Sequence, residues 1–181
     1  MRITFPRRRF NTLAMTFTSL VPPLALAAQN QSKAPATTGT GATEHVHNGV
    51  YYFSGIGANS GYPREDQVVV TDPFEKHATR AMEGVKKSLE RAGCTMDSIL
   101  QLQVFTCLPH SDKVPELTAQ ARFDAYTAQY QSFNKVYRGF FSSGKTPARA
   151  FMSVDWIPGN SLVEIVGCAR VVGTPKNPAA L

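Results

Sequence analysis

The segment Thr146–Val172, TPARAFMSVDWIPGNSLVEIVGCARVV, decides the fold. In its first part, alternate side chains are apolar, and this period of two predicts a β-strand over residues 149–155. The run Ile157–Asn160, IPGN, predicts a tight turn, because proline fixes φ and glycine and asparagine tolerate a positive φ. The apolar run from Leu162 to Val172 predicts a strand covered on both faces. The segment is therefore expected to close the sheet as a paired hairpin.

Two charged residues interrupt this hairpin. Arg149 begins the first strand, and Glu164 lies between Val163 and Ile165 in the second. A carboxylate in an apolar strand costs several kcal/mol unless it is paired, hydrogen-bonded or at a wet cleft. If the hairpin turns at Pro158–Gly159, Arg149 and Glu164 are about 13 Å apart along the sheet, which is too far for direct pairing in one chain. They are either part of a ligand site or ion-pair partners between subunits.

The preceding chain predicts alternating strands and helices. Strands are expected at 50–55, more weakly at 67–70, and at 99–107. A first helix should begin with Asp72 as its N-cap and Pro73 at its first position, and end at Gly93. Its apolar stripe comprises Phe74, Ala78, Ala81, Met82, Val85 and Leu89. With a second helical region at 117–141, the order β-β-α-β-α-β-β predicts an α+β domain with the helices on one face of a mixed sheet.

The second helical region carries a long aromatic stripe. Its members recur at helical spacing: Phe123, Tyr126, Tyr130, Phe133, Val136, Tyr137, Phe140 and Phe141. A stripe of this kind is more often core than a stacking platform for bases. We therefore expect these side chains to pack on the sheet.

The N-terminus resembles an export signal. The basic run Arg7–Phe10 precedes an apolar run from Leu13 to Leu26, and Ala25–Ala27 fits an A-x-A cleavage site. The same arginines fit a twin-arginine signal. Residues 1–27 are thus predicted to be a signal peptide and 28–45 a disordered linker. The expected location is periplasmic or secreted, without stable membrane insertion after cleavage; an organellar transit peptide is the alternative.

Composition limits the possible classes of function. The chain of 181 residues has a formal charge of +6, but 4 of its 19 basic residues lie in the first 27, leaving 15 against 13 acidic residues. This small, scattered excess argues against a nucleic-acid partner. Cys94, Cys107 and Cys168 form no C-x-x-C pattern, so they predict buried side chains and no metal site.

Several motifs together resemble the RidA/YjgF family of reactive-intermediate deaminases. They are Ser54-Gly55, Phe133-Asn134-Lys135-Val136-Tyr137 with Phe140-Phe141, Pro147-Ala148-Arg149 and Val163-Glu164-Ile165. The resemblance runs from about Val50 to Val172. It implies a chorismate-mutase-like fold, with the domain at 46–173 and a tail at 174–181. It also implies a homotrimer with clefts between the subunits.

The resemblance implies hydrolysis of 2-imino or enamine acids to 2-oxo acids and ammonia. No cofactor is needed, because an imine is already electrophilic. Arg149 would clamp the substrate carboxylate with its planar guanidinium, and Glu164 would orient or deprotonate the attacking water. Asn134 would support the site by hydrogen bonds, and the backbone of Ser54 and Gly55 would line it.

The chain also departs from the family pattern. Ile56 replaces a glutamine, Phe151 replaces a small cleft residue and narrows the site, and a tyrosine position falls at Gly41. An extra segment lies between Leu108 and Gln131. These departures keep open an alternative function, a non-catalytic trimeric protein that binds small carboxylates. Ribonuclease activity, claimed for some family members, has no basic and aromatic surface to support it in this sequence.

Overall fold

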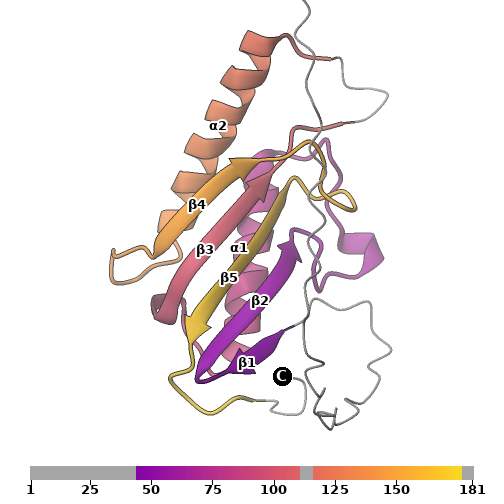
Figure 1. The fold of residues 1–181 in the computed structure, drawn as a ribbon. Coiled ribbons are helices and arrows are strands. Elements are labelled where there is room, and N and C mark those ends of the chain that lie inside the picture. Colours follow the sequence, from indigo (N-terminus) through magenta and orange to yellow (C-terminus); the bar gives the residue numbers. More distant parts are fainter. Residues whose placement is uncertain (1–43, 111–115, 177–181) are drawn as a thin grey trace, which may run out of the picture. The chain divides into compact units, whose positions relative to one another are not determined.

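The computed structural model describes residues 44–110 and 116–176 (Figure 1). The predicted signal peptide, most of the predicted linker and the end of the tail lie outside these residues. The strands are β1 (His45–His47), β2 (Val50–Gly57), β3 (Ile99–Thr106), β4 (Ala148–Ser153) and β5 (Val163–Arg170). The helices are α1 (Phe74–Arg91) and α2 (Ala119–Arg138), with short 3₁₀ turns at Arg64–Asp66 and Met96–Ser98.

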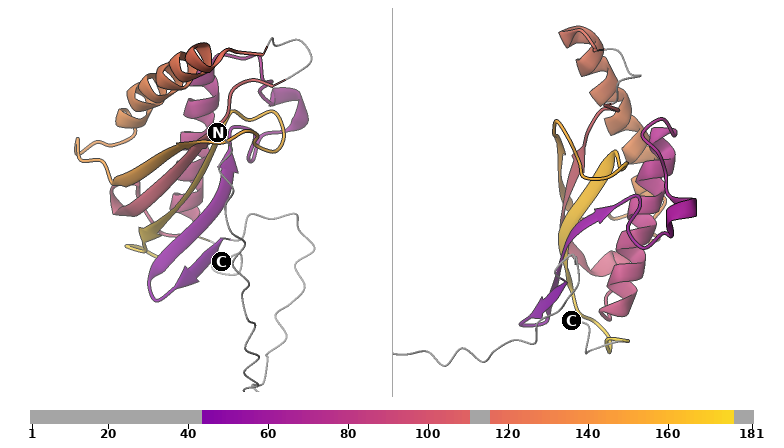
Figure 2. Two further views of the ribbon diagram at one scale, coloured as in Figure 1. Left: turned by 45° about the horizontal axis from the view of Figure 1, so that its top comes forward. Right: turned by 90° about the vertical axis from the view of Figure 1, so that its right-hand side faces the viewer.

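The described strands form one mixed sheet in the order β1-β2-β5-β3-β4. Only β3 and β4 are parallel, and the other neighbours are antiparallel. Both helices cover the same face of this sheet, as Figure 2 shows in its right-hand view. The predicted α+β class, with a mixed sheet and two helices on one face, is confirmed.

The predicted closing hairpin is wrong. Strand β3 lies between β4 and β5 and is hydrogen-bonded to both. The connecting segment crosses the end of β3. It contains the predicted turn at Gly159–Asn160, where Gly159 has a φ of +73°, but this turn does not join two paired strands. The Val154 amide donates to the carbonyl of Thr106, and the Cys107 amide donates to the carbonyl of Leu162. Ile157 is buried against Cys107 and Leu162, so this apolar cluster holds the crossing in place.

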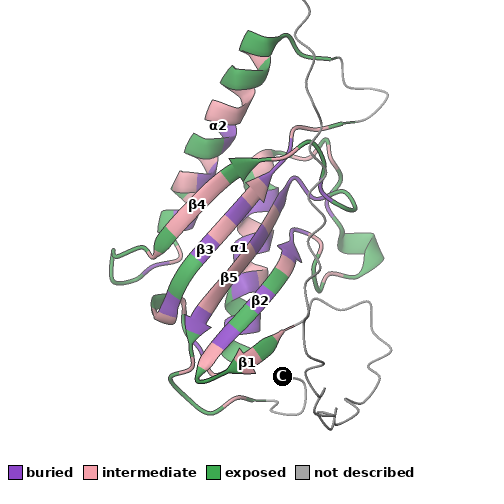
Figure 3. Cartoon of the chain, viewed as in Figure 1, coloured by how far each residue is buried: buried purple, intermediate pink, exposed green. Residues whose placement is uncertain are grey.

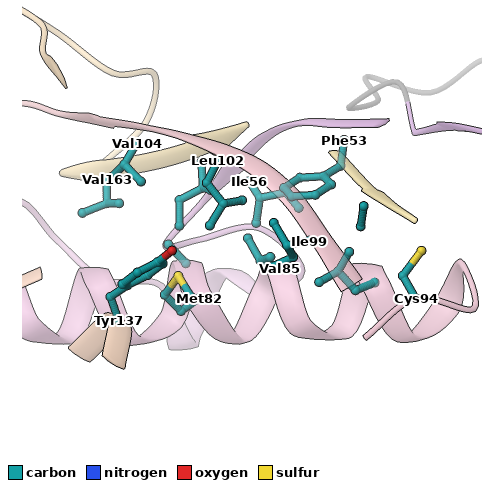
Figure 4. Close-up of a cluster of buried hydrophobic side chains, with 14 of the residues drawn as sticks. Phe53, Ile56, Met82, Val85, Cys94, Ile99, Leu102, Val104, Tyr137 and Val163 are labelled. Carbon is teal, nitrogen blue, oxygen red and sulfur yellow. The ribbon is translucent and has the colours of Figure 1, made fainter. Parts of the chain in front are cut away.

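The core lies between the sheet and α1. In Figure 4, Leu102, Val104 and Val163 of the sheet lie over Met82 and Val85 of α1. All the predicted stripe residues of α1 from Ala78 to Leu89 are buried, as their helical spacing requires. The residues that alternate with the buried ones along the strands are exposed or half-buried, and Figure 3 shows this mixture of burial classes in the sheet. Their side chains point to the other face.

Two local predictions before α1 are wrong. Residues 67–70 form no strand; the Asn59 side chain instead bonds both the amide and the carbonyl of Val68, which leaves Val68 buried outside the sheet. Asp72 does not cap α1. Its carboxylate accepts from the Val69 amide at 2.9 Å and pairs with Lys76 at 3.1 Å. Asp72 therefore stabilises the turn that precedes the helix.

The aromatic stripe of α2 is core only in its C-terminal half. Phe133, Tyr137 and the following Phe141 are buried, whereas Phe123 is 66% and Tyr130 is 45% exposed. The N-terminal half of α2 extends beyond the end of the sheet in Figure 1, so the sheet does not cover its apolar side there. Among the described residues, no helix is both long and apolar enough to cross a bilayer.

Candidate functional site

Arg149 is held between the edge strand β4 and helix α2. Its Nη2 donates to Oδ1 of Asn134 at 2.6 Å. Its guanidinium carbon lies 4.5 Å from the ring centroid of Tyr137. Asn134 and Tyr137 are three residues apart on α2, so they present one contact surface to the strand. The helix thus fixes the position and orientation of the guanidinium.

Further rings surround the same guanidinium. Its carbon lies 5.3 Å from the ring centroid of Phe133 and 5.8 Å from those of Tyr130 and Phe151. The ring centroids of Phe151 and Tyr130 are 5.2 Å apart, and the two rings are nearly perpendicular. Such rings stabilise a cation through their negative faces. They neutralise no charge, so the site keeps its positive charge.

One end of the guanidinium has no partner. Nη1 of Arg149 is buried and donates to no acceptor within the described residues. The ion pairs in that part of the chain are Lys76 with Asp72 and Arg91 with Glu44, and Arg149 belongs to neither. A buried donor without an acceptor costs about 1–3 kcal/mol. An anion that bonded Nη1 would recover this energy.

A hollow of about 320 Å³ opens beside this guanidinium. Tyr130 and Asn134 line it from α2, and Thr146 and Pro147 line it from the segment before β4. The Tyr137 hydroxyl donates to the Pro147 carbonyl at 3.4 Å, and burial raises the pKa of this tyrosine. Tyr137 therefore stays neutral near pH 7 and does not compete with a ligand as an anion.

Glu164 is half-buried and lies on the opposite face of the sheet. Its neighbours Val163 and Ile165 are buried against the helices, so its own side chain points away from them. Arg149 is aligned with Leu102, and Leu102 with Gly167, which is three residues from Glu164. The Cα atoms of Arg149 and Glu164 are therefore separated by two strand spacings and three residues, which is about 14 Å. The expected separation is retained, although the register that predicted it was wrong.

Ser54 and Gly55 lie with Glu164 and apart from Arg149. They form an irregularity in the pairing of β2 with β5, where Gly55 has a φ of +69°. Ser54 is exposed, between the buried Phe53 and the bulge, on the face that Glu164 occupies. The predicted site residues thus form two groups. Arg149, Asn134 and Phe151 lie on the helix side at β4, and Ser54, Gly55 and Glu164 on the open face.

The sequence interpretation missed part of the hollow. Helical spacing predicts Tyr130 in the core, and the motifs indicate no role for Arg138, yet both line this hollow. Tyr130, Asn134 and Arg138 are spaced four residues apart, which puts them in one row along α2. Their spacing of four residues on either side of Asn134, the predicted cleft residue, is the sequence signal that could have identified Tyr130 and Arg138 as site residues.

A larger hollow of about 610 Å³ lies elsewhere, where the end of β3 meets α2. It combines Glu116 and Asp155 with Arg122 beside the exposed Trp156. Its mixed charges define no ligand, and it contains none of the predicted site residues. Within the described ranges, no three histidine, cysteine, aspartate or glutamate residues gather as a metal site. The hollow at Arg149 is therefore the candidate site.

These features describe an α+β protein with an arginine at the edge of its sheet, surrounded by aromatic rings and without an acidic partner among the described residues. The family model described as endoribonuclease L-PSP matches residues 31–171. The chain belongs to this family, and the resemblance to RidA/YjgF proteins is confirmed.

Solved structures agree with this assignment. A putative endoribonuclease from Thermotoga maritima is 26% identical with a TM-score of 0.55, covering 78% of this chain and 94% of its own. A putative endoribonuclease L-PSP from Entamoeba histolytica is 25% identical with a TM-score of 0.54, covering 76% and 92%. RidA from an Antarctic Psychrobacter is 23% identical with a TM-score of 0.53, covering 76% and 94%. The last similarity supports the fold alone.

Proposed function

We propose that this protein hydrolyses 2-imino or enamine acids to 2-oxo acids and ammonia. The observation that carries the proposal is the Arg149 guanidinium, fixed by Asn134 and Tyr137 and left with a buried, unpartnered Nη1. A substrate carboxylate satisfies this donor, and a fork of two N–H groups matches its geometry. The ring of Phe151 lies 5.8 Å from the guanidinium carbon and helps to hold the arginine in place, but it does not line the hollow itself.

The reaction needs only water. The water oxygen bonds to the imine carbon, the C–N bond breaks, and nitrogen leaves as ammonia with both water protons. A general base that takes the first proton and returns it to nitrogen accelerates both steps. Glu164 is the proposed base. Since it is about 14 Å from Arg149 and on the other face of the sheet, it must serve a substrate held by another copy of the chain.

We propose a homotrimer on the same grounds. The open face of the sheet carries the exposed Tyr52 and Met152 beside half-buried apolar residues of β3 and β5. An apolar face of this kind is typical of a surface that a second subunit covers. Cyclic symmetry repeats one heterologous contact, so each copy gives its open-face residues to one neighbour and its Arg149 to the other.

The activity test is ammonia release from 2-iminopropanoate, generated in situ by an amino-acid oxidase acting on alanine. Wild-type protein should accelerate release, and Arg149→Ala should abolish the acceleration. Arg80→Ala is the matched control, because Arg80 also stacks on a tyrosine, Tyr62, at 4.2 Å but lies away from the hollow. Equal rates for wild type and Arg149→Ala would refute the proposal. Single-stranded RNA assayed in parallel controls for the activity that the family description names.

A non-catalytic carboxylate-binding protein is the second candidate. It is favoured by the separation of Glu164 from Arg149 within one chain. In that case 2-oxobutanoate would bind in calorimetry and Arg149→Ala would abolish binding, but imine hydrolysis would proceed at the rate without protein. Glu164→Gln distinguishes the two candidates, since it should reduce turnover and leave binding unchanged only if the protein is an enzyme.

A further inference from the structure

The hollow at Arg149 contains a second guanidinium that the proposed reaction does not use. Arg138 is the last residue of α2 and lines the hollow together with Arg149. It follows Asn134 by four residues, so the two share one side of the helix, about 6 Å apart along its axis. Because Asn134 holds the Arg149 guanidinium at 2.6 Å, this guanidinium lies about one helical turn from the position of Arg138 on α2.

The lining of this hollow contains no acidic residue. Neither arginine takes part in an ion pair within residues 44–110 or 116–176. Asp97, the acid near the turn after α2, is bonded to the hydroxyls of Ser142 and Ser143. The hollow thus has two positive charges and no counter-charge from the part of the chain that the structure describes. One carboxylate neutralises only half of it.

We infer that the ligand of this hollow is a dianion, a short dicarboxylic 2-imino or 2-oxo acid. Its first carboxylate, next to the imine or keto carbon, binds Arg149. Its second carboxylate, at the far end of the carbon chain, binds Arg138. This inference rests on the proposed function, because it assigns Arg149 to the reacting end of the substrate, and it adds the substrate class.

The geometry gives the two arginines different roles. Arg149 is caged and partly buried, so it supplies most of the affinity for any 2-oxo acid. Arg138 is exposed, and an exposed charge pair changes a dissociation constant by about fivefold at most. Arg138 therefore determines specificity, and its contribution should weaken as salt rises. Its place at the C-terminus of α2 also suits the helix dipole, which anchors it with or without a ligand.

The test uses two ligands that differ by one carboxylate, 2-oxopentanedioate and 2-oxopentanoate. Calorimetry on the full-length protein at low salt should show that the dianion binds at least about threefold more tightly. Arg138→Gln should remove this preference and leave the affinity for 2-oxopentanoate unchanged, whereas Arg138→Lys should keep part of it. Arg80→Gln, which removes a charge elsewhere on the surface, should keep the preference in full.

The outcomes separate this inference from the proposed function. Equal affinity of wild type for the two ligands overturns the inference, as does a preference that survives Arg138→Gln. In either case, loss of 2-oxopentanoate binding in Arg149→Ala still supports the carboxylate clamp. If neither ligand binds and Arg149→Ala changes nothing, both the clamp and the dianion site are wrong.

Discussion

Replacing Arg149 by methionine tests whether this arginine serves a ligand or the fold. Methionine keeps a flexible chain against the surrounding rings and removes the charge. The variant loses the hydrogen bond to Asn134, a charged bond of about 1.5–3 kcal/mol, and the stacking on Tyr137, about 0.5–1 kcal/mol. It gains back the cost of the buried, unpartnered Nη1, about 1–3 kcal/mol. We expect the free energy of unfolding to fall by only about 1 kcal/mol, because the gain offsets most of the loss.

Urea unfolding at one fixed protein concentration measures this change, since an oligomer's stability depends on concentration. A carboxylate ligand at one hundred times its dissociation constant should then stabilise the wild type by about 2.7 kcal/mol and leave the variant unaffected. Arg80→Met, at the other stacked arginine, should retain the ligand effect. A loss of about 3 kcal/mol or more without ligand would refute the reasoning, because breaking a structural buried ion pair has that cost.

Three other predictions concern the rest of the chain. His77 is buried; its Nε2 donates to the Val69 carbonyl and its Nδ1 accepts from the Leu162 amide, and burial lowers its pKa below 6.5. As the pH falls, His77 therefore binds a proton in the unfolded chain before it does so in the folded protein. The free energy of unfolding should decrease below about pH 6.5, by at most about 1.4 kcal/mol per pH unit. In urea unfolding, His77→Gln should make this pH dependence weaker. Gly93→Ala should destabilise the protein more than Gly144→Ala. Both glycines have a positive φ, but only at Gly93 would the new Cβ lie 2.6 Å from the Gly173 carbonyl oxygen. Equal decreases in the melting temperature would refute this steric argument. Mature protein should begin at Ala28, and N-terminal sequencing that finds Met1 would contradict export.

The sequence predicts which face a side chain occupies better than which strands are neighbours. Alternation in β3 and the stripe of α1 predict the core, because burial depends on the local period. The apolar run of β5 predicts a strand covered on both faces, and this is wrong: Val163, Ile165 and Ala169 are buried, but the residues between them are only half-buried. The insertion of β3 between β4 and β5 has no such signal. Neighbouring strands can pair in several orders with the same faces buried, and the Ile157 cluster that holds the crossing depends on residues far apart in sequence.

The candidate site was predictable only in part, for a similar reason. The motifs identify Arg149 and Asn134, which the structure joins at 2.6 Å. Helical spacing also groups Tyr130 with the core aromatics, but periodicity does not show where α2 leaves the sheet. Tyr130 therefore lies half-exposed at the hollow. Arg138 at a helix end has an ordinary structural explanation, and only the hollow gives it another.

Mixing two inactive variants tests the central claim, that Arg149 of one copy works with Glu164 of another. Arg149→Ala and Glu164→Gln, with different tags, are unfolded together in equal amounts and refolded, and hybrid oligomers are verified by native mass spectrometry. In a cyclic oligomer with random mixing, about a quarter of the sites receive both intact residues, so about a quarter of the wild-type imine hydrolysis should return. Verified hybrids that stay as inactive as either variant alone would contradict the claim, because a site completed within one chain cannot be restored by mixing.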